Sequence, residues 1–170
     1  MLRGVLKIRR ALPSDLPAIF AIHDEEVLHG TGTFDTVPFT PEQRSAWLLA
    51  HQSETYPALV ADDGVQVLAW GTLSPWMHKG ACQRCAEVTV FVHRHSHVEG
   101  LGRMLFQELI VHARTVGLGV LISGVCPDNQ PAHELDSTFG FRYVGTLHKV
   151  GSKFGRLLDL ELFELPLDAV

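Results

Sequence analysis

The hydrophobic period of the chain changes once between residues 84 and 116, and this change most narrows the possible folds. Apolar side chains first alternate with other residues, the period of a β-strand, at Ala86, Val88, Val90 and Val92. They then recur every four residues, as on one face of an amphipathic helix, at Leu101, Leu105, Leu109 and Ala113. A short loop that contains Gly100 joins the two segments. This pattern predicts a mixed α/β domain.

Along the whole chain, periodicity predicts the element order β-α-α-β-β-β-α-β-α-β-β. The expected strands cover residues 5–10, 58–61, 65–73, 84–92, 120–125, 141–150 and 157–165. The expected helices cover residues 16–28, 100–116 and 129–138, and another opens at Thr40-Pro41-Glu42. Asp63-Gly64 is typical of a hairpin turn, which gives the sheet an antiparallel start. No linker or repeat interrupts the pattern, so we expect a single domain over residues 1–170.

Composition excludes several classes of function. The net charge is −5 with scattered basic residues, which disfavours nucleic-acid binding. No apolar run approaches the ~18 residues that cross a bilayer, and the N-terminus has no signal-like stretch. Three cysteines are too few for a disulfide framework. We therefore expect a cytoplasmic protein without membrane or nucleic-acid partners.

The loop between the strand at residues 84–92 and the following helix has the composition of an anion site. Gly100 and Gly102 let the backbone approach a ligand closely. Loop amides and a helix N-terminus then suit a phosphate or pyrophosphate. A tight strand-to-helix turn without a ligand would have the same local sequence. A dinucleotide fingerprint is disfavoured, because a third glycine is missing and the motif lies far from the N-terminus.

Longer motifs resemble a known family. Residues 97–102 resemble the acetyl-CoA loop (Arg/Gln-x-x-Gly-x-Gly/Ala) of the GCN5-related N-acetyltransferases (GNAT), with His97 at the first position. Within that family the chain is similar to phosphinothricin and methionine sulfone/sulfoximine acetyltransferases. Four stretches carry this similarity: residues 56–61, 87–92, 100–102 and 150–159. The resemblance covers about residues 5–165.

The resemblance implies a fold and a cofactor site. It implies a mixed central sheet of about seven strands with four helices, in which the strands at residues 84–92 and 120–125 splay apart. The pantetheine arm of acetyl-CoA, the co-substrate, would enter that gap and pair with backbone groups as an added strand does. A backbone N–H near Phe91 or Val92 would polarise the thioester carbonyl. The implied acetyl-CoA-binding residues are Val90, Phe91, Val92, His97, Val98, Glu99, Gly100, Leu101, Gly102, Arg103 and Asn129.

Catalytic and substrate residues also follow from the resemblance. Glu87 matches an acidic residue on the same strand and would accept the amine proton. A solvated carboxylate or an ion pair with Arg84 is the alternative for Glu87. The implied substrate-binding residues are Phe34, Trp76, Lys79, Arg84 and Lys153. The chain departs from the pattern of its relatives at Met77, where they carry Arg or Lys, and at Gln83, where some carry Arg. It also departs at Asp136, where the family more often has the His or Tyr that is the usual candidate to protonate the thiolate.

These observations predict an acetyl-CoA-dependent N-acetyltransferase that acts on a small primary amine, such as phosphinothricin or methionine sulfone/sulfoximine. An acetyltransferase of peptide N-termini or polyamines, or a non-catalytic acetyl-CoA sensor, is the alternative. An acidic cleft around Asp24, Glu25 and Glu26 would favour a polyamine, and a closed pocket over Phe34 and Trp76 an amino-acid analogue. His93, His95 and His97 lead into the cofactor loop, and Cys82 and Cys85 lack a second pair, so we expect no metal. The low charged fraction of 19% favours a homodimer, and the resemblance implies one because the relatives are commonly homodimers.

Overall fold

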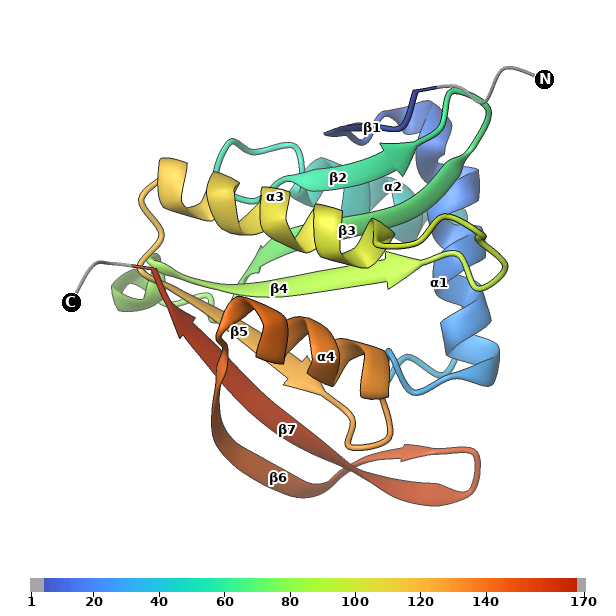
Figure 1. The fold of residues 1–170 in the computed structure, drawn as a ribbon. Coiled ribbons are helices and arrows are strands. Elements are labelled where there is room, and N and C mark those ends of the chain that lie inside the picture. Colours follow the sequence, from blue (N-terminus) through green and yellow to red (C-terminus); the bar gives the residue numbers. More distant parts are fainter. Residues whose placement is uncertain (1–4, 168–170) are drawn as a thin grey trace.

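A computed structural model describes residues 5–167, so the ends of the expected 1–170 domain lie outside the described range. A seven-stranded sheet runs through it (Figure 1). The strands are β1 (Lys7–Arg10), β2 (Ala58–Asp62), β3 (Val67–Pro75), β4 (Cys85–Val92), β5 (Val120–Val125), β6 (Arg142–Lys153) and β7 (Arg156–Pro166). The helices are α1 (Leu16–His29), α2 (Pro41–Ala50), α3 (Leu101–Thr115) and α4 (Gln130–Phe139). This order of strands and helices confirms the one expected from the sequence.

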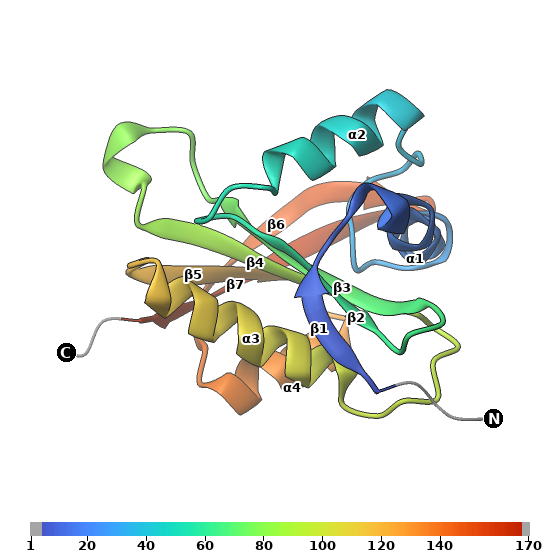
Figure 2. The ribbon, with the colours of Figure 1, turned by 90° about the horizontal axis from the view of Figure 1, so that it is seen from above.

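The sheet is a middle layer between two pairs of helices. Its strand order is β1-β2-β3-β4-β5-β7-β6, and only the β4–β5 pair is parallel among the described strands. Figure 2 shows α1 and α2 on one face and α3 and α4 on the other. The mixed α/β sheet with four helices is therefore confirmed within residues 5–167.

Both faces of the sheet are apolar because the strands in the middle are covered on both sides. Leu73, Val88 and Leu121 pack with the Leu109 face of α3. On the opposite face, Trp70 belongs to a second cluster with residues of α1 and α2. The four-residue apolar period of the sequence therefore marks the face that α3 turns to the sheet.

The parallel strands β4 and β5 stay paired over a short stretch only. The pairs run from Cys85 with Val120 to Glu87 with Ile122, and β4 continues beyond them to Val92. The antiparallel pairing of β4 with β3 extends as far as Val92. The ladder on one side of β4 thus ends five residues before the strand does, which confirms the expected splay.

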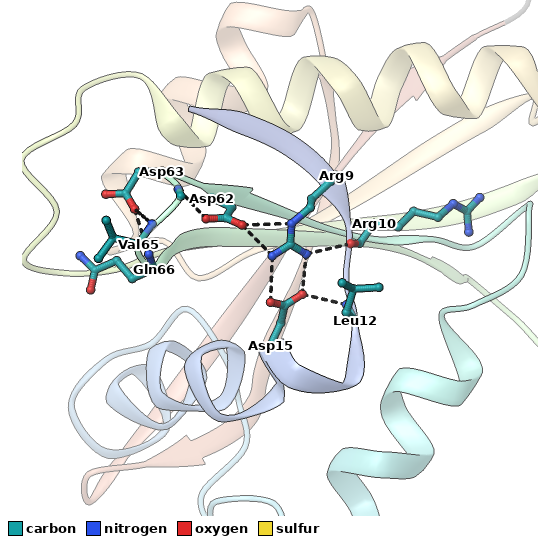
Figure 3. A network of polar contacts seen from close by, with 9 residues as sticks. Arg9, Arg10, Leu12, Asp15, Asp62, Asp63, Val65 and Gln66 are labelled. Atoms are coloured by element: carbon teal, nitrogen blue, oxygen red, sulfur yellow. Dashed lines mark hydrogen bonds and ion pairs between the residues drawn. The ribbon is translucent and has the colours of Figure 1, made fainter. Parts of the chain in front are cut away.

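A network around Arg9 fixes the edge of the sheet (Figure 3). The Arg9 guanidinium donates to Asp15 Oδ2 at 2.6 Å and to Asp62 Oδ2 at 2.7 Å. Asp15 precedes α1, and Asp62 ends β2 at the turn toward β3. Hydrogen bonds from Arg9 hold the pKa of Asp15 below its ordinary value. One side chain of β1 therefore joins the sheet to the start of α1.

Several strand boundaries differ from the sequence-based expectation: β1 begins at Lys7 rather than at residue 5, β6 continues to Lys153 rather than ending at residue 150, and β3 begins two residues late. The strand expected at residue 65 begins at Val67, because the turn takes up two more residues. Asp63 Oδ1 accepts from the amides of Val65 and Gln66, both at 2.9 Å, and Gly64 has a φ of 85°. An aspartate side chain that bonds to backbone two and three residues ahead competes with strand pairing.

Candidate active site

A cavity of about 570 Å³ opens where β4 and β5 part. Side chains from both faces of β4 line it: Glu87, Thr89 and Phe91 from one face, Val88 and Val90 from the other. Ser123, Gly124 and Val125 of β5 line the opposite side. The cavity therefore passes through the gap in the sheet, and the walls beyond the sheet come from the four helices, residues 31–35 and Phe39.

Glu87 lies at the last paired position before the gap. It stands opposite Ser74 on β3 and Ile122 on β5, with its side chain half-buried on the cavity wall. A Cβ at Gly124 would lie 3.8 Å from Glu87 Oε1, so the carboxyl reaches across to β5. Burial raises the pKa of Glu87 because the charged form loses hydration. A carboxyl with a raised pKa is a stronger proton acceptor than an exposed one.

Three of the expected acetyl-CoA contacts lie on the free edge of β4. Val90 and Phe91 line the cavity, and Val92 ends the strand with 41% of its surface exposed. Because β5 pairs with β4 no further than Glu87, the β5 side of these residues has the unpaired backbone that an extended ligand can join.

The loop before α3 has the geometry of an anion site. Gly100 is the N-cap of α3 with a φ of 76°, and no side chain caps the helix. The first amides of an α-helix have no partner within the helix, so they are free to bind an anion. Leu101 is fully buried and anchors the turn, whereas His97, Val98, Glu99 and Arg103 are exposed around it. Gly102 sits between Val92 and Leu135, each 3.5 Å from where its Cβ would be.

Asn129 reaches the cavity from the start of α4. Its Oδ1 accepts from the Ala132 amide at 3.3 Å, so it caps the helix. It also lines the cavity. Asn129 can cap the helix and contact the cofactor at the same time. Its Oδ1 forms the cap, and its side-chain NH2 group can still donate a hydrogen bond.

Of the expected substrate residues, Phe34 alone lines the cavity. Its ring lies against Gly151 of β6, where a Cβ would come within 2.7 Å of it. Lys153 is 5% exposed and lies outside the cavity wall. Its ammonium donates to the carbonyl oxygens of Glu26 and Thr33, at 2.8 and 2.9 Å. Lys153 therefore holds the segment that carries Phe34.

The other three expected substrate residues lie in the connection between β3 and β4. Trp76 follows β3, Lys79 is exposed, and Arg84 Nε donates to the Gly117 carbonyl at 3.3 Å. None of them lines the cavity. In this chain, the structure does not bring them together with Glu87 and Phe34.

Several wall residues are missing from the sequence-based set. Trp47 and Trp70 form part of the wall, with rings 5.3 Å apart. His51 and Ser74 line it as well. No local motif marks these residues, because α2 and β3 meet only in the folded chain.

Asp136 of α4 is a buried carboxyl residue on the cavity wall. It follows Asn129, the N-cap of α4, by seven residues, which is about two helical turns. The side chain is 2% exposed, lines the cavity, and has no partner at Oδ2 in the described structure. Burial raises the pKa of Asp136 to about 6, although a hydrogen bond from Ser123 opposes the shift. A buried carboxyl group with a raised pKa therefore lies on the cavity wall at this position.

The comparisons with known proteins agree with this geometry. Residues 17–141 match the model of the acetyltransferase (GNAT) family. The chain belongs to this family. As a GNAT protein it is an acetyl-CoA-dependent N-acetyltransferase, which confirms the enzyme class expected from the sequence.

Similar proteins cover nearly the whole GNAT chain. A phosphinothricin N-acetyltransferase of Streptomyces coelicolor is 34% identical over 165 residues, covering 95% of this chain and 96% of that protein. An L-methionine sulfoximine/L-methionine sulfone acetyltransferase of Pseudomonas aeruginosa is 35% identical over 162 residues, covering 95% and 94%. A Salmonella typhimurium structure with its cofactor acetyl-CoA has a TM-score of 0.91 at 32% identity, covering 97% of this chain and 95% of that one.

The residues present fit acetyl-CoA. An unpaired edge of β4, a cavity through the sheet and a glycine-capped helix N-terminus lie next to one another. Acetyl-CoA supplies a thioester whose carbonyl carbon an amine can attack. Among residues 5–167, no group of three or more His, Cys, Asp or Glu side chains could hold a metal ion. No described helix is long and apolar enough to span a membrane.

Proposed function

We propose that this GNAT enzyme acetylates the primary amine of a small amino-acid analogue of the methionine sulfone/sulfoximine or phosphinothricin type. The observation that carries the proposal is the position of Glu87, which lines the same cavity as the free edge of β4 and Phe34. The amine would attack the thioester directly after Glu87 removes a proton from its ammonium form. Holding both reactants in one cavity supplies the proximity that such a transfer needs.

The cofactor residues divide into two groups in this proposal. Backbone groups of Val90, Phe91 and Val92 bind the pantetheine arm, and the amides from Val98 to Arg103 bind the pyrophosphate. His97 and Asn129 border these two regions. The unpaired β4 edge and the uncapped α3 N-terminus support these roles.

The aromatic wall of the cavity favours an amino-acid analogue over a polyamine, although the carboxyl groups of Asp35, Glu87 and Asp136 also line it. Asp24 Oδ2 lies 2.9 Å from Arg44 Nη2, and Glu26 Oε1 lies 3.2 Å from Arg94 Nη2. Neither carboxylate lines the cavity, so they form no open acidic cleft there. The wall instead carries the aromatic rings of Phe34, Phe39 and Trp47, which suit a compact apolar side chain.

The cavity also favours an uncharged side chain on the substrate. No lysine or arginine lies among the described residues that line it. Phosphinothricin carries a phosphinate in addition to its carboxylate, whereas methionine sulfone carries a neutral sulfone. A second buried anion without a cation is costly. We therefore propose that methionine sulfone and sulfoximine are better substrates than phosphinothricin.

Localisation and assembly are proposed on other grounds. Cys82, Cys85 and Cys126 are free thiols, which suits a reducing compartment such as the cytoplasm.

Strand β6, at the edge of the sheet, carries exposed apolar side chains: Tyr143, Val144, Leu147 and Val150. A second copy of the chain would cover them, so we propose a homodimer of single-domain subunits.

A thiol-release assay tests the substrate proposal. Purified enzyme and acetyl-CoA are mixed with methionine sulfone, methionine sulfoximine, phosphinothricin, spermidine or an alanyl peptide, and free CoA is measured. We expect kcat/KM for the two methionine analogues to exceed that for spermidine and the peptide at least ~10-fold. A higher value for spermidine or the peptide would refute the proposed substrate class.

A further inference from the structure

The ring of His51 has a defined protonation state. His51 caps the C-terminus of α2, and its Nδ1 lies 2.7 Å from the Trp47 carbonyl oxygen. A carbonyl oxygen only accepts hydrogen bonds, so Nδ1 carries the proton. Burial lowers the pKa of His51, which favours the neutral form of the ring. Its Nε2 is therefore an acceptor, and it lies 2.9 Å from Ser74 Oγ.

Ser74 joins this histidine to the catalytic region. It lies directly opposite Glu87 in the β3–β4 ladder, and both side chains line the cavity. Side chains at directly opposite positions stand with their Cβ atoms about 4.5–5.5 Å apart. Ser74 therefore lies beside Glu87 on the same face of the sheet, with its Oγ 2.9 Å from His51 Nε2.

The reaction requires more than one proton acceptor. A substrate ammonium (R–NH3⁺) becomes an amide (R–NH–), so its nitrogen loses two protons. Glu87 takes the first, which leaves the amine free to attack. The attack forms the C–N bond, makes the nitrogen positive again and releases the second proton while the C–S bond breaks. The CoA thiolate gains one proton from solvent, so one proton is released in total.

We infer that Ser74 and His51 form a proton relay that removes the second proton. Ser74 Oγ accepts the proton from the nitrogen and passes its own proton to His51 Nε2. The resulting imidazolium keeps its Nδ1–H bond to the Trp47 carbonyl, and Nε2 later returns the proton to solvent. His51 acts through Ser74, so it is a positioning and proton-storing residue that does not touch the amine.

Other titratable groups line the same cavity, and their effects on a pH–rate profile must be distinguished from that of His51. They are His23 on α1, Asp35 in the loop after it, Glu87 on β4, Cys126 after β5 and Asp136 on α4. His23 already pairs with Asp35, with Nε2 at 3.1 Å from Oδ2. No hydrogen bond joins Ser74 to any of these five groups in the described structure, so variants of Ser74 isolate the relay.

The test compares Ser74→Ala, Ser74→Thr and His51→Gln with wild type, using whichever amine the wild-type enzyme acetylates fastest. We expect kcat at pH 7 to fall about 10-fold or more in Ser74→Ala and His51→Gln, with the KM for acetyl-CoA within twofold. The loss of kcat relative to wild type should become smaller above pH 9, because hydroxide can then take the second proton. The double variant should be no slower than either single variant, because both break one relay. Ser74→Thr keeps the hydroxyl and should recover most of the rate.

Matched controls come from the same kinds of side chain away from the cavity. His112 Nε2 bonds to the Glu54 carbonyl on the surface, and Ser45 Oγ donates to the Pro41 carbonyl. His112→Gln and Ser45→Ala should keep wild-type kcat. The ¹⁵N shifts of the His51 ring give a readout without turnover, and we expect a neutral ring protonated at Nδ1 at pH 7.

Three results would overturn the relay. One is a Ser74→Ala enzyme with wild-type kcat at every pH. Another is a deficit that is the same at pH 6.5 and pH 9.5, which is the sign of a purely structural role. The third is a His51 ring that is charged or protonated at Nε2 in the free enzyme at pH 7. If His51→Gln fails to fold, the kinetics of Ser74→Ala and the ¹⁵N shifts of the His51 ring still test the relay. An unexpected preferred amine would change the substrate proposal but not this test.

Discussion

The ammonium of Lys153 donates to the carbonyl oxygen of Thr33 at 2.9 Å, although 120 residues separate the two along the chain. The same ammonium donates to the Glu26 carbonyl at 2.8 Å. Lys153 ends β6, and Thr33 precedes Phe34 in the loop after α1. The hairpin of β6 and β7 therefore fixes the position of an aromatic ring on the cavity wall.

Lys153→Met should loosen this loop, because methionine keeps most of the side-chain length but has no donor. We expect the KM for the amine to rise about tenfold, since Phe34 loses its fixed position. Two carbonyl oxygens lose a charged donor, which should lower the free energy of unfolding by ~2 kcal/mol. Kinetics and chemical denaturation measure both effects, with exposed Lys7→Met as the control. An unchanged KM for the amine would show that the loop is held by other contacts.

Glu87→Gln should lower kcat about 100-fold or more while acetyl-CoA still binds, because only the base is lost. In the wild type, kcat/KM should fall as pH drops through the raised pKa of Glu87, since the carboxylate must be deprotonated to accept a proton. The variant should lack this acid limb. Steady-state rates from pH 5 to pH 9 and CoA calorimetry provide the measurement. Wild-type rates across that range would remove Glu87 from the role of base.

Asp136→Asn should change the pH dependence of stability. The pKa of Asp136 rises from 3.8 to about 6 on folding, so the native state binds the proton more tightly than the unfolded state. Wild-type stability should therefore decrease as pH rises between these values, by up to ~3 kcal/mol. The variant has no such charge to bury and should be the more stable protein at pH 8. Urea unfolding at pH 3.5 and pH 8 tests this, and the exposed Glu134→Gln on the same helix should show no such difference.

Gly100→Ala should weaken acetyl-CoA binding specifically. The φ of 76° at Gly100 lies in the left-handed region, where an alanine costs about 1 kcal/mol. No atom lies within 4 Å of where the new Cβ would be, so the cost is in backbone conformation rather than in a clash. We expect the KM for acetyl-CoA to rise about fivefold, with the KM for the amine unchanged. Equal KM values for acetyl-CoA in variant and wild type would argue that the α3 N-terminus tolerates another geometry.

Much of the fold could be predicted from local periodicity. The four-residue repeat from Leu101 to Ala113 predicts the buried face of α3, and the alternation around Val88 predicts the strand β4 before it. Glu87 could be placed on the right strand for the same reason. These predictions succeed because they depend only on neighbours along the chain.

The rest of the site depends on contacts between distant segments. His51 meets Ser74 because α2 packs on the sheet, and no spacing in the sequence encodes that contact. Lys153 is a similar case, since a lysine on a strand is usually exposed, but here two backbone carbonyls surround its ammonium. Trp76 and Lys79 are the opposite case. The sequence motif predicts them in the substrate site, but neither residue lines the cavity.

The central claim is that Glu87, beside the gap between β4 and β5, takes a proton from an amine held in the same cavity. A crystal structure of Glu87→Gln with acetyl-CoA and methionine sulfone tests it most directly, because the slow variant preserves both reactants. We predict the amine nitrogen about 3–3.5 Å from the thioester carbon and on the same side of the gap as residue 87. An amine bound out of reach of residue 87, or a thioester outside the gap, would contradict the account.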